Sequence, residues 1–231
     1  MKKHLICIIL LLTCVATFAQ YQKGDLFVYP RIGFSLANVS PNDLYFGFQD
    51  SDLRKSKRKA GLAIGVEAER FMNSILSLSA GILYANQGYR YADWGEQDRR
   101  SDTFANVEDM HSDMQYIGLP LLLNGYLAER LALKVGIQPA WLIKAQSHRK
   151  ESSGIIENES NYVVNSSETI DENTTDLCHR MDFSVPVGMS YEYKHIVIDL
   201  RYNIGLTKAF KHSADGRNNA IVVTLGYQIE P

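Results

Sequence analysis

The stretch His195–Phe210 reads HIVIDLRYNIGLTKAF, and apolar side chains recur at every second residue. Successive side chains on a β-strand point to opposite faces, so one face of this segment suits an apolar medium and the other is polar. The apolar face carries Ile196, Ile198, Leu200, Tyr202, Ile204 and Leu206, and the other face carries Val197, Asp199, Arg201, Asn203, Gly205 and Thr207. The stretch therefore predicts a two-faced β-strand.

The same two-residue period recurs along the chain in seven of eight predicted strands. The exception is the fourth strand, where Leu122 breaks the alternation and Pro120 removes a backbone donor, so we expect a local irregularity there. The predicted strands are Leu26–Asn38, Lys59–Phe71, Ser74–Tyr91, Met110–Leu127, Leu131–Gln146, His179–Tyr193, His195–Phe210 and Asn218–Glu230.

The connections between these strands alternate in length. Tight turns lie at 72–73, 128–130 and 194–195, and between them run the long polar segments 39–58, 92–109 and 147–178. An even strand count, short turns at one end and long loops at the other are typical of bacterial outer-membrane barrels. We therefore predict an all-β fold, an eight-stranded antiparallel up-and-down transmembrane β-barrel in the cell outer membrane.

A secretory leader precedes the predicted barrel. Lys2 and Lys3 form its charged start, Leu5–Leu12 its apolar centre, and Thr17-Phe18-Ala19 a small-residue cleavage site. We expect cleavage before Gln20, which leaves residues 20–231 as one barrel domain; a lipid-modified Cys14 is the alternative, but Leu11-Leu12-Thr13 fits it poorly. Cleavage would move the formal charge from −2 to about −4, and this lack of basic excess argues against a nucleic-acid partner.

The composition of the polar face indicates which side of the barrel meets lipid. A soluble lipocalin-like carrier, the main alternative, would hide its apolar face and present large polar side chains to water. Here the polar face is rich in Gly, Ala and Ser, which suit the crowded bore of an eight-stranded barrel. The charged residues of that face have both signs, and we expect them to form an ion network in the lumen: Arg31, Glu67, Glu69, Lys134, Asp182, Glu192, Asp199 and Arg201.

Aromatic residues of outward parity fit the same orientation. Tyr191 and Tyr227 fall near the turn end, whereas Tyr84 and Trp141 fall toward the loop end. Aromatic girdles at the two membrane interfaces have this distribution.

The sequence leaves several functional hypotheses open. The acidic segment Ser147–Cys178 is a candidate for binding cations or a basic partner, or else a solvated and partly disordered loop. The basic residues Arg54, Lys55, Lys57, Arg58 and Lys59 are candidates for contact with lipopolysaccharide phosphates. A charged lumen argues against a diffusive channel.

A lipid-modifying enzyme is the remaining alternative. His111-Ser112-Asp113 has the residue types of a triad, but neighbours on a strand point to opposite faces and cannot form one. His148, His179 and Asp176 are the best candidate base or metal site, and Cys178 beside His179 is more simply a loop-base residue. We predict no catalytic, cofactor or metal residues, and expect a monomer.

Three short segments resemble the PorT-like outer-membrane β-barrel family of the Bacteroidetes: Tyr116–Leu123 (YIGLPLLL), Val135–Pro139 (VGIQP) and Ile198–Thr207 (IDLRYNIGLT). The leader ending Phe18-Ala19-Gln20 is similar to the usage of that phylum. The resemblance implies an eight-stranded outer-membrane barrel. One member of that family serves a protein-secretion and surface-attachment system and most have no assigned role. We therefore expect a non-enzymatic barrel, structural or partner-binding through its long extracellular loops, with an accessory role in secretion and an envelope or secretion protein as partner as the finer hypothesis.

Overall fold

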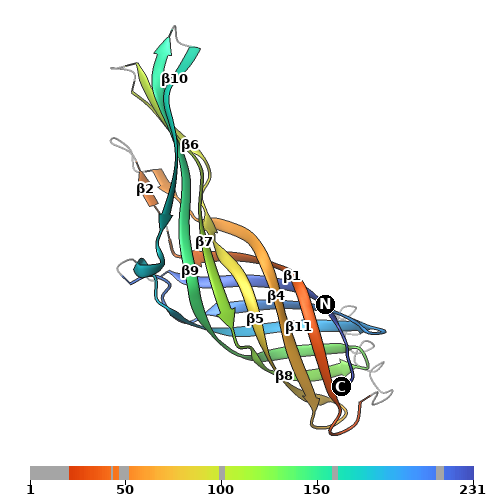
Figure 1. The fold of residues 1–231 in the computed structure, drawn as a ribbon. Coiled ribbons are helices and arrows are strands. Elements are labelled where there is room, and N and C mark those ends of the chain that lie inside the picture. The colour runs from red at the N-terminus through yellow and green to blue at the C-terminus, as the bar shows by residue number, and fades with distance from the viewer. Residues whose placement is uncertain (1–20, 43, 47–51, 99–101, 158–160, 212–215) are drawn as a thin grey trace, which may run out of the picture.

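The protein is described by a computed structural model, in which residues 21–42, 44–46, 52–98, 102–157, 161–211 and 216–231 are placed. One large antiparallel sheet closes into a barrel, and part of it continues beyond one end of the barrel as a tall arm (Figure 1). The predicted leader, residues 1–19, lies outside the described residues.

Nine strands make the barrel wall. They are β1 (Leu26–Ser40), β4 (Lys57–Phe71), β5 (Leu76–Arg90), β7 (Thr103–Gly118), β8 (Leu121–Ala128), β9 (Leu131–Glu157), β11 (Met181–Tyr193), β12 (Ile196–Gly205) and β13 (Arg217–Tyr227). The wall strands pair in the order β1–β4–β5, then β7 or β8, then β9–β11–β12–β13, and β13 pairs with β1, which closes the circuit. Strands β7 and β8 share one place between β5 and β9, so the wall has eight positions. The all-β antiparallel barrel is confirmed.

The break between β7 and β8 falls where the sequence predicts an irregularity. β7 ends at Gly118 and β8 begins at Leu121, directly after Pro120. Because proline has no N–H, the ladder cannot run through this position, and the β7 and β8 segments pair with different parts of β5.

In the wall, apolar side chains are exposed and charged side chains are buried, which is the reverse of the pattern in a soluble protein. In β12, Ile196, Ile198 and Leu200 are 42–50% exposed, whereas Asp199 and Arg201 are at most 4% exposed. The same alternation of exposed apolar and buried polar residues follows β1, β4, β11 and β13. The apolar band faces outward and the charged residues fill the bore.

Two long segments predicted to be loops are largely strands instead. Segment 92–109 contains β6 (Trp94–Asp98) and the start of β7, and segment 147–178 contains the end of β9, β10 (Asn161–Asn173) and the short 3-10 helix η1 (Thr175–Leu177). Because β9 continues past the barrel, it pairs with β7 on one side and β10 on the other, so backbone ladders replace a solvated loop over the described residues. The short strands β2 (Leu44–Phe46) and β3 (Asp52–Arg54) pair within segment 39–58.

Candidate functional site

Five of the charged residues predicted for the lumen meet in one cluster. The carboxylate of Glu67 lies 2.5 Å from Arg201, 3.2 Å from Arg31 and 3.4 Å from Lys134. The carboxylate of Asp199 lies 2.6 Å from the Nε of Arg201, 2.9 Å from Lys134 and 3.3 Å from Arg31. All five side chains are at most 5% exposed, and β1, β4, β9 and β12 supply them from opposite sides of the bore. Buried charges persist only when paired, so this cluster ties the walls together across the lumen.

The other three predicted lumen residues lie elsewhere in the bore. Glu69 accepts hydrogen bonds from Ser77, from Asn124 at 3.0 Å and from Tyr126 at 2.8 Å. Glu192 accepts one from the Tyr21 hydroxyl, and Asp182 accepts one from Thr207 at 2.6 Å. These carboxylates are held by neutral donors rather than by the central cluster.

The turn end of the bore is filled by aromatic rings that sequence reasoning missed. The Tyr21 ring stacks on Phe71 at 4.1 Å between centroids and lies 5.4 Å from both Phe27 and Tyr126. Tyr21 is 4% exposed and precedes the first strand, so no strand periodicity marks it. The cavity beside the charged cluster measures about 10 Å³, room for about one water molecule. The charged cluster and the aromatic rings fill the bore at their own levels. At the turn end, a cavity of about 430 Å³ opens beside the rings and is lined by Tyr21, Phe27 and Glu192 among others.

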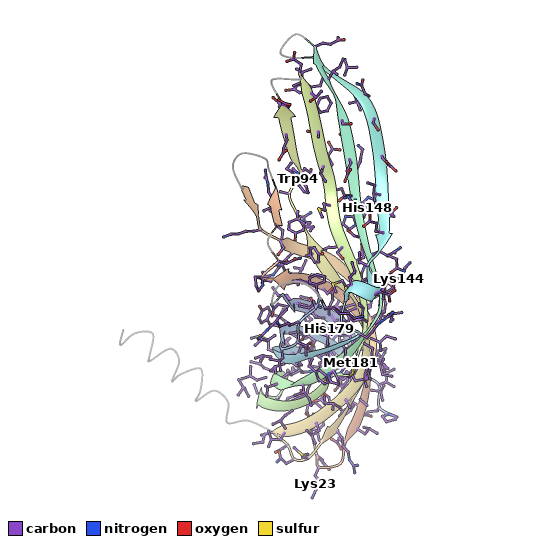
Figure 2. The ribbon with its side chains drawn as sticks, turned by 90° about the vertical axis from the view of Figure 1, so that its left-hand side faces the viewer. Lys23, Trp94, Lys144, His148, His179 and Met181 are labelled. Carbon is purple, nitrogen blue, oxygen red and sulfur yellow. The ribbon has the colours of Figure 1, made fainter. Side chains whose placement is uncertain are left out.

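The arm is a four-stranded sheet in the order β6–β7–β9–β10, and we define it as residues 94–98, 103–113, 144–157 and 161–173. It rises from one end of the barrel, with Trp94 and His148 in the arm and Lys23 at the opposite end of the barrel (Figure 2). Its side chains are mainly polar on both faces. A sheet of this length standing clear of the barrel offers an extended surface for contact.

An aromatic contact joins two strands of the arm, β7 and β10, which are separated by β9. The rings of Phe104 on β7 and Tyr162 on β10 meet edge to face at 5.4 Å, and the Tyr162 hydroxyl accepts a hydrogen bond from Gln97 on β6 at 2.7 Å. Between them, β9 has Gly154, where a Cβ would lie 2.8 Å from the Phe104 ring and 2.0 Å from the Val163 carbonyl oxygen. The missing side chain lets β7 and β10 touch over β9.

Gly154→Val is therefore expected to open the tip of the arm while leaving the barrel intact. The added side chain must push Phe104 and the β10 backbone away, so amide hydrogen exchange of β10 residues should quicken at least tenfold. Ser153→Val, at an exposed neighbouring position, is the matched control and should leave that exchange unchanged. Equal exchange in the two variants would contradict the role given to Gly154.

The structure does not bring together His148 and His179, the two histidines of the candidate base or metal site. His148 lies opposite His111 of β7, with ring centroids 4.9 Å apart, and its Nδ1 lies 2.6 Å from Asp171. Figure 2 shows His148 in the arm and His179 at the end of the barrel. The strand β9 runs straight past the barrel rim, whereas the chain returns to the rim through η1 before His179.

Comparison with known proteins identifies the family. The family model described as outer membrane protein beta-barrel domain matches residues 18–211. The chain belongs to this family. It is thus a small outer-membrane β-barrel protein, and its exposed apolar band is the surface that meets lipid.

Several solved structures are similar to this outer-membrane barrel. Ail of Yersinia pestis is 13% identical, with 90% of this chain and 100% of that chain covered and a TM-score of 0.41. Neisserial surface protein A is 10% identical, with 88% and 97% covered and a TM-score of 0.41. OprG from Pseudomonas aeruginosa is 10% identical, with 93% and 100% covered and a TM-score of 0.33. A comparison with curated proteins gave no match.

The residues predicted for the aromatic girdles lie on the outside of the barrel. Tyr191 and Tyr227 are 47% and 54% exposed, Trp141 is 43% exposed, and Tyr84 is partly exposed. Tyr191 pairs with Leu131 at the turn end, whereas Trp141 pairs with Met181 at the end that bears the arm.

Other candidate chemistry is sparse in the described part of the chain. There, no helix is long and apolar enough to cross a membrane, and no group of three His, Cys, Asp or Glu side chains is arranged to hold a metal ion. Within the sequence His111-Ser112-Asp113, the imidazole lies 3.4 Å from Asp113, while Ser112 is buried on the opposite face of β7.

Cys178 is buried at the barrel rim. It is 1% exposed and packs with Met114 and Leu142, and this burial raises the pKa of its thiol to about 11 from an ordinary 9.0. The thiol stays protonated at neutral pH, and its stabilising contribution is complete below pH 9 and lost as pH rises toward 11. We expect native protein at pH 7 to resist maleimide labelling and unfolded protein to label fully; rapid native labelling would contradict this burial.

Proposed function

We propose that this protein is a non-enzymatic outer-membrane barrel that binds a protein partner through its arm. The observation that carries the proposal is the arm itself, a four-stranded sheet standing clear of the barrel. Long connections of such barrels lie outside the cell and short turns lie in the periplasm, so the arm faces the cell exterior. The charged cluster and the aromatic rings plug the bore, which leaves the barrel the role of an anchor.

The charge of the arm supports recognition of a basic partner. Its four ranges contain ten Asp and Glu residues against three Lys and Arg residues, a formal charge of −7, although the whole chain carries only −2. Acid is therefore concentrated in the part of the protein that reaches farthest from the membrane. Such a field attracts cationic partners and speeds their encounter.

An accessory role in protein secretion is a finer form of the same proposal. It rests on the resemblance of Tyr116–Leu123, Val135–Pro139 and Ile198–Thr207 to the PorT-like family. Under this proposal the partner is a secreted or envelope protein that passes the barrel at the cell surface.

Lipopolysaccharide is a second proposed contact, at the base of the arm. Lys55, Lys57 and Arg58 are exposed there, whereas Lys59 is engaged by Asp113 at 2.5 Å. Free cations at this level suit lipid phosphates. Changing Lys55, Lys57 and Arg58 together to Gln should weaken lipopolysaccharide binding by purified protein severalfold; unchanged binding would remove this contact.

Removal of the arm tests the main proposal. His148 pairs with Asp171 and Trp94 pairs with Val107, so residues 149–170 and 95–106 can each be replaced by Asn-Gly turns without altering the barrel wall. We expect crosslinking of intact cells to join a defined partner to the full protein and not to the armless one, with equal heat-modifiable gel mobility as the folding control. An identical set of crosslinked proteins from both forms would refute partner binding through the arm.

A further inference from the structure

We infer that β10 is a docking edge for an extended, cationic polypeptide segment, which joins the arm as an additional antiparallel strand; the inference rests on the proposed partner-binding role. It follows from three features of β10: its place in the sheet, the direction of its backbone groups and its charge.

β10 lies at the end of the sheet order and is 13 residues long. One side of it pairs with β9, and within the described ranges no strand pairs with its other side. An unpaired strand edge is a template for pairing with another chain. A register shift between Val164 and Ser166 interrupts the ladder near the tip, so the regular part of the edge runs from Ser166 to Asn173.

The direction of the backbone groups along this edge follows from one hydrogen bond. The N–H of Thr174 donates to the carbonyl of Ala145 on β9 at 3.0 Å. In an antiparallel pair the backbone groups of alternate residues point toward and away from the partner strand. Glu168, Ile170 and Glu172 therefore direct their backbone groups to β9, while Ser167, Thr169 and Asp171 direct theirs to the open edge.

The side chains of β10 carry negative charge, which favours a cationic partner strand. The strand has three acidic residues, Glu168, Asp171 and Glu172, and neither Lys nor Arg. Asp171 pairs with His148, and Arg149 pairs with both Glu151 and Glu172. Glu168 faces Glu151 across the ladder, and among the described residues no cation lies within ion-pair distance of Glu168. A Lys or Arg on an added strand would supply the cation that Glu168 lacks, and opposite charges at facing positions stabilise strand pairing.

The same charges disfavour a second copy of this chain as the occupant. Pairing two β10 edges would place Glu168, Asp171 and Glu172 of one copy beside the same residues of the other, and contact between like charges opposes that pairing. Natural edge strands often use charge to prevent self-pairing in this way. A cationic strand from another protein meets no such cost.

A synthetic peptide tests the edge without the native partner. The probe alternates lysine and threonine and matches β10 in length; one control replaces lysine with glutamate, and another carries N-methyl groups on every second residue. We expect the lysine peptide to bind purified full-length protein with an affinity that falls as salt increases, and each control peptide to bind at least tenfold more weakly. N-methylation blocks strand pairing but keeps the charge, so equal binding of the methylated peptide would overturn strand addition.

Variants of β10 test whether the lysine peptide binds at the open edge of this strand. Thr169→Pro removes a backbone donor at the open edge and retains the β10–β9 ladder, so peptide affinity should fall roughly tenfold relative to Thr169→Val, which keeps that donor. Glu168→Lys should cause a comparable loss. Equal affinity for the lysine peptide in Thr169→Pro and Thr169→Val would place binding elsewhere and overturn the inference.

The cell crosslinking experiment separates this inference from the proposed function. If removal of the arm abolishes partner capture and Thr169→Pro does not, the arm binds its partner but not by this edge, and the inference fails alone. If neither change affects capture, both fail. Loss of capture in Thr169→Pro but not in Thr169→Val supports both.

Discussion

Glu67→Ala is expected to lower the free energy of unfolding by about 3–5 kcal/mol. In the native barrel Glu67 lies within 3.4 Å of Arg201, Arg31 and Lys134. Its removal leaves three buried cations with Asp199 as the one remaining carboxylate of the cluster. The change should appear as a lower midpoint in urea titration of the detergent-folded protein, followed by gel mobility.

A surface ion pair on the arm provides the matched control. Lys150 and Glu108 lie 3.2 Å apart, and both side chains are nearly half exposed. Exposed pairs of this kind contribute about 0–1 kcal/mol, so Glu108→Ala should leave the midpoint almost unchanged. If Glu67→Ala were as mild as Glu108→Ala, the central cluster would not hold the barrel together.

Leu200→Arg is expected to destabilise the protein in a bilayer by about 2–4 kcal/mol. Leu200 points outward between Asp199 and Arg201, the inward residues of the central cluster, so it lies well inside the apolar band. An arginine there places a charge in hydrocarbon. Refolding into lipid vesicles, with the folded fraction followed against urea, measures the loss.

Ile155→Arg is the control that distinguishes the cost of placing a charge in lipid from the cost of placing it at an exposed position in water. Ile155 is 38% exposed and Leu200 is 42% exposed, but Ile155 lies on the arm, outside the barrel. Its substitution should change stability by less than about 0.5 kcal/mol, as at an ordinary surface position. Equal losses in the two variants would contradict a lipid-facing wall.

The barrel could be predicted from the sequence because its wall obeys a strict local rule. Each wall strand has lipid on one side and packed charge on the other, so parity alone assigned Asp199, Arg201 and Glu67 to the lumen. Which lumen charges meet could not be predicted, since this depends on the stagger of distant strands. That stagger brings Arg31 and Lys134 into the cluster and leaves Glu69 with Asn124 and Tyr126.

The strands of the arm could not be predicted from the sequence because they have no apolar face. Both of its faces meet water, so its strands have no apolar period, and segment 147–178 has the polar composition of a loop. Long backbone ladders and a few cross-strand contacts, such as Phe104 with Tyr162, form it instead. The pairing of His148 with His111 could not be inferred because nothing in the sequence shows that β9 continues straight beyond the barrel rim.

A cysteine scan along Ile196–Gly205 in lipid vesicles tests the account most directly. Single cysteines in a Cys178→Ser background would carry a fluorophore, quenched by nitroxides attached to lipid chains. We predict strong quenching at positions 196, 198, 200, 202 and 204 and weak quenching at the positions between them. Quenching of the opposite parity, or equal quenching along the strand, would contradict a barrel with an apolar exterior and a charged interior.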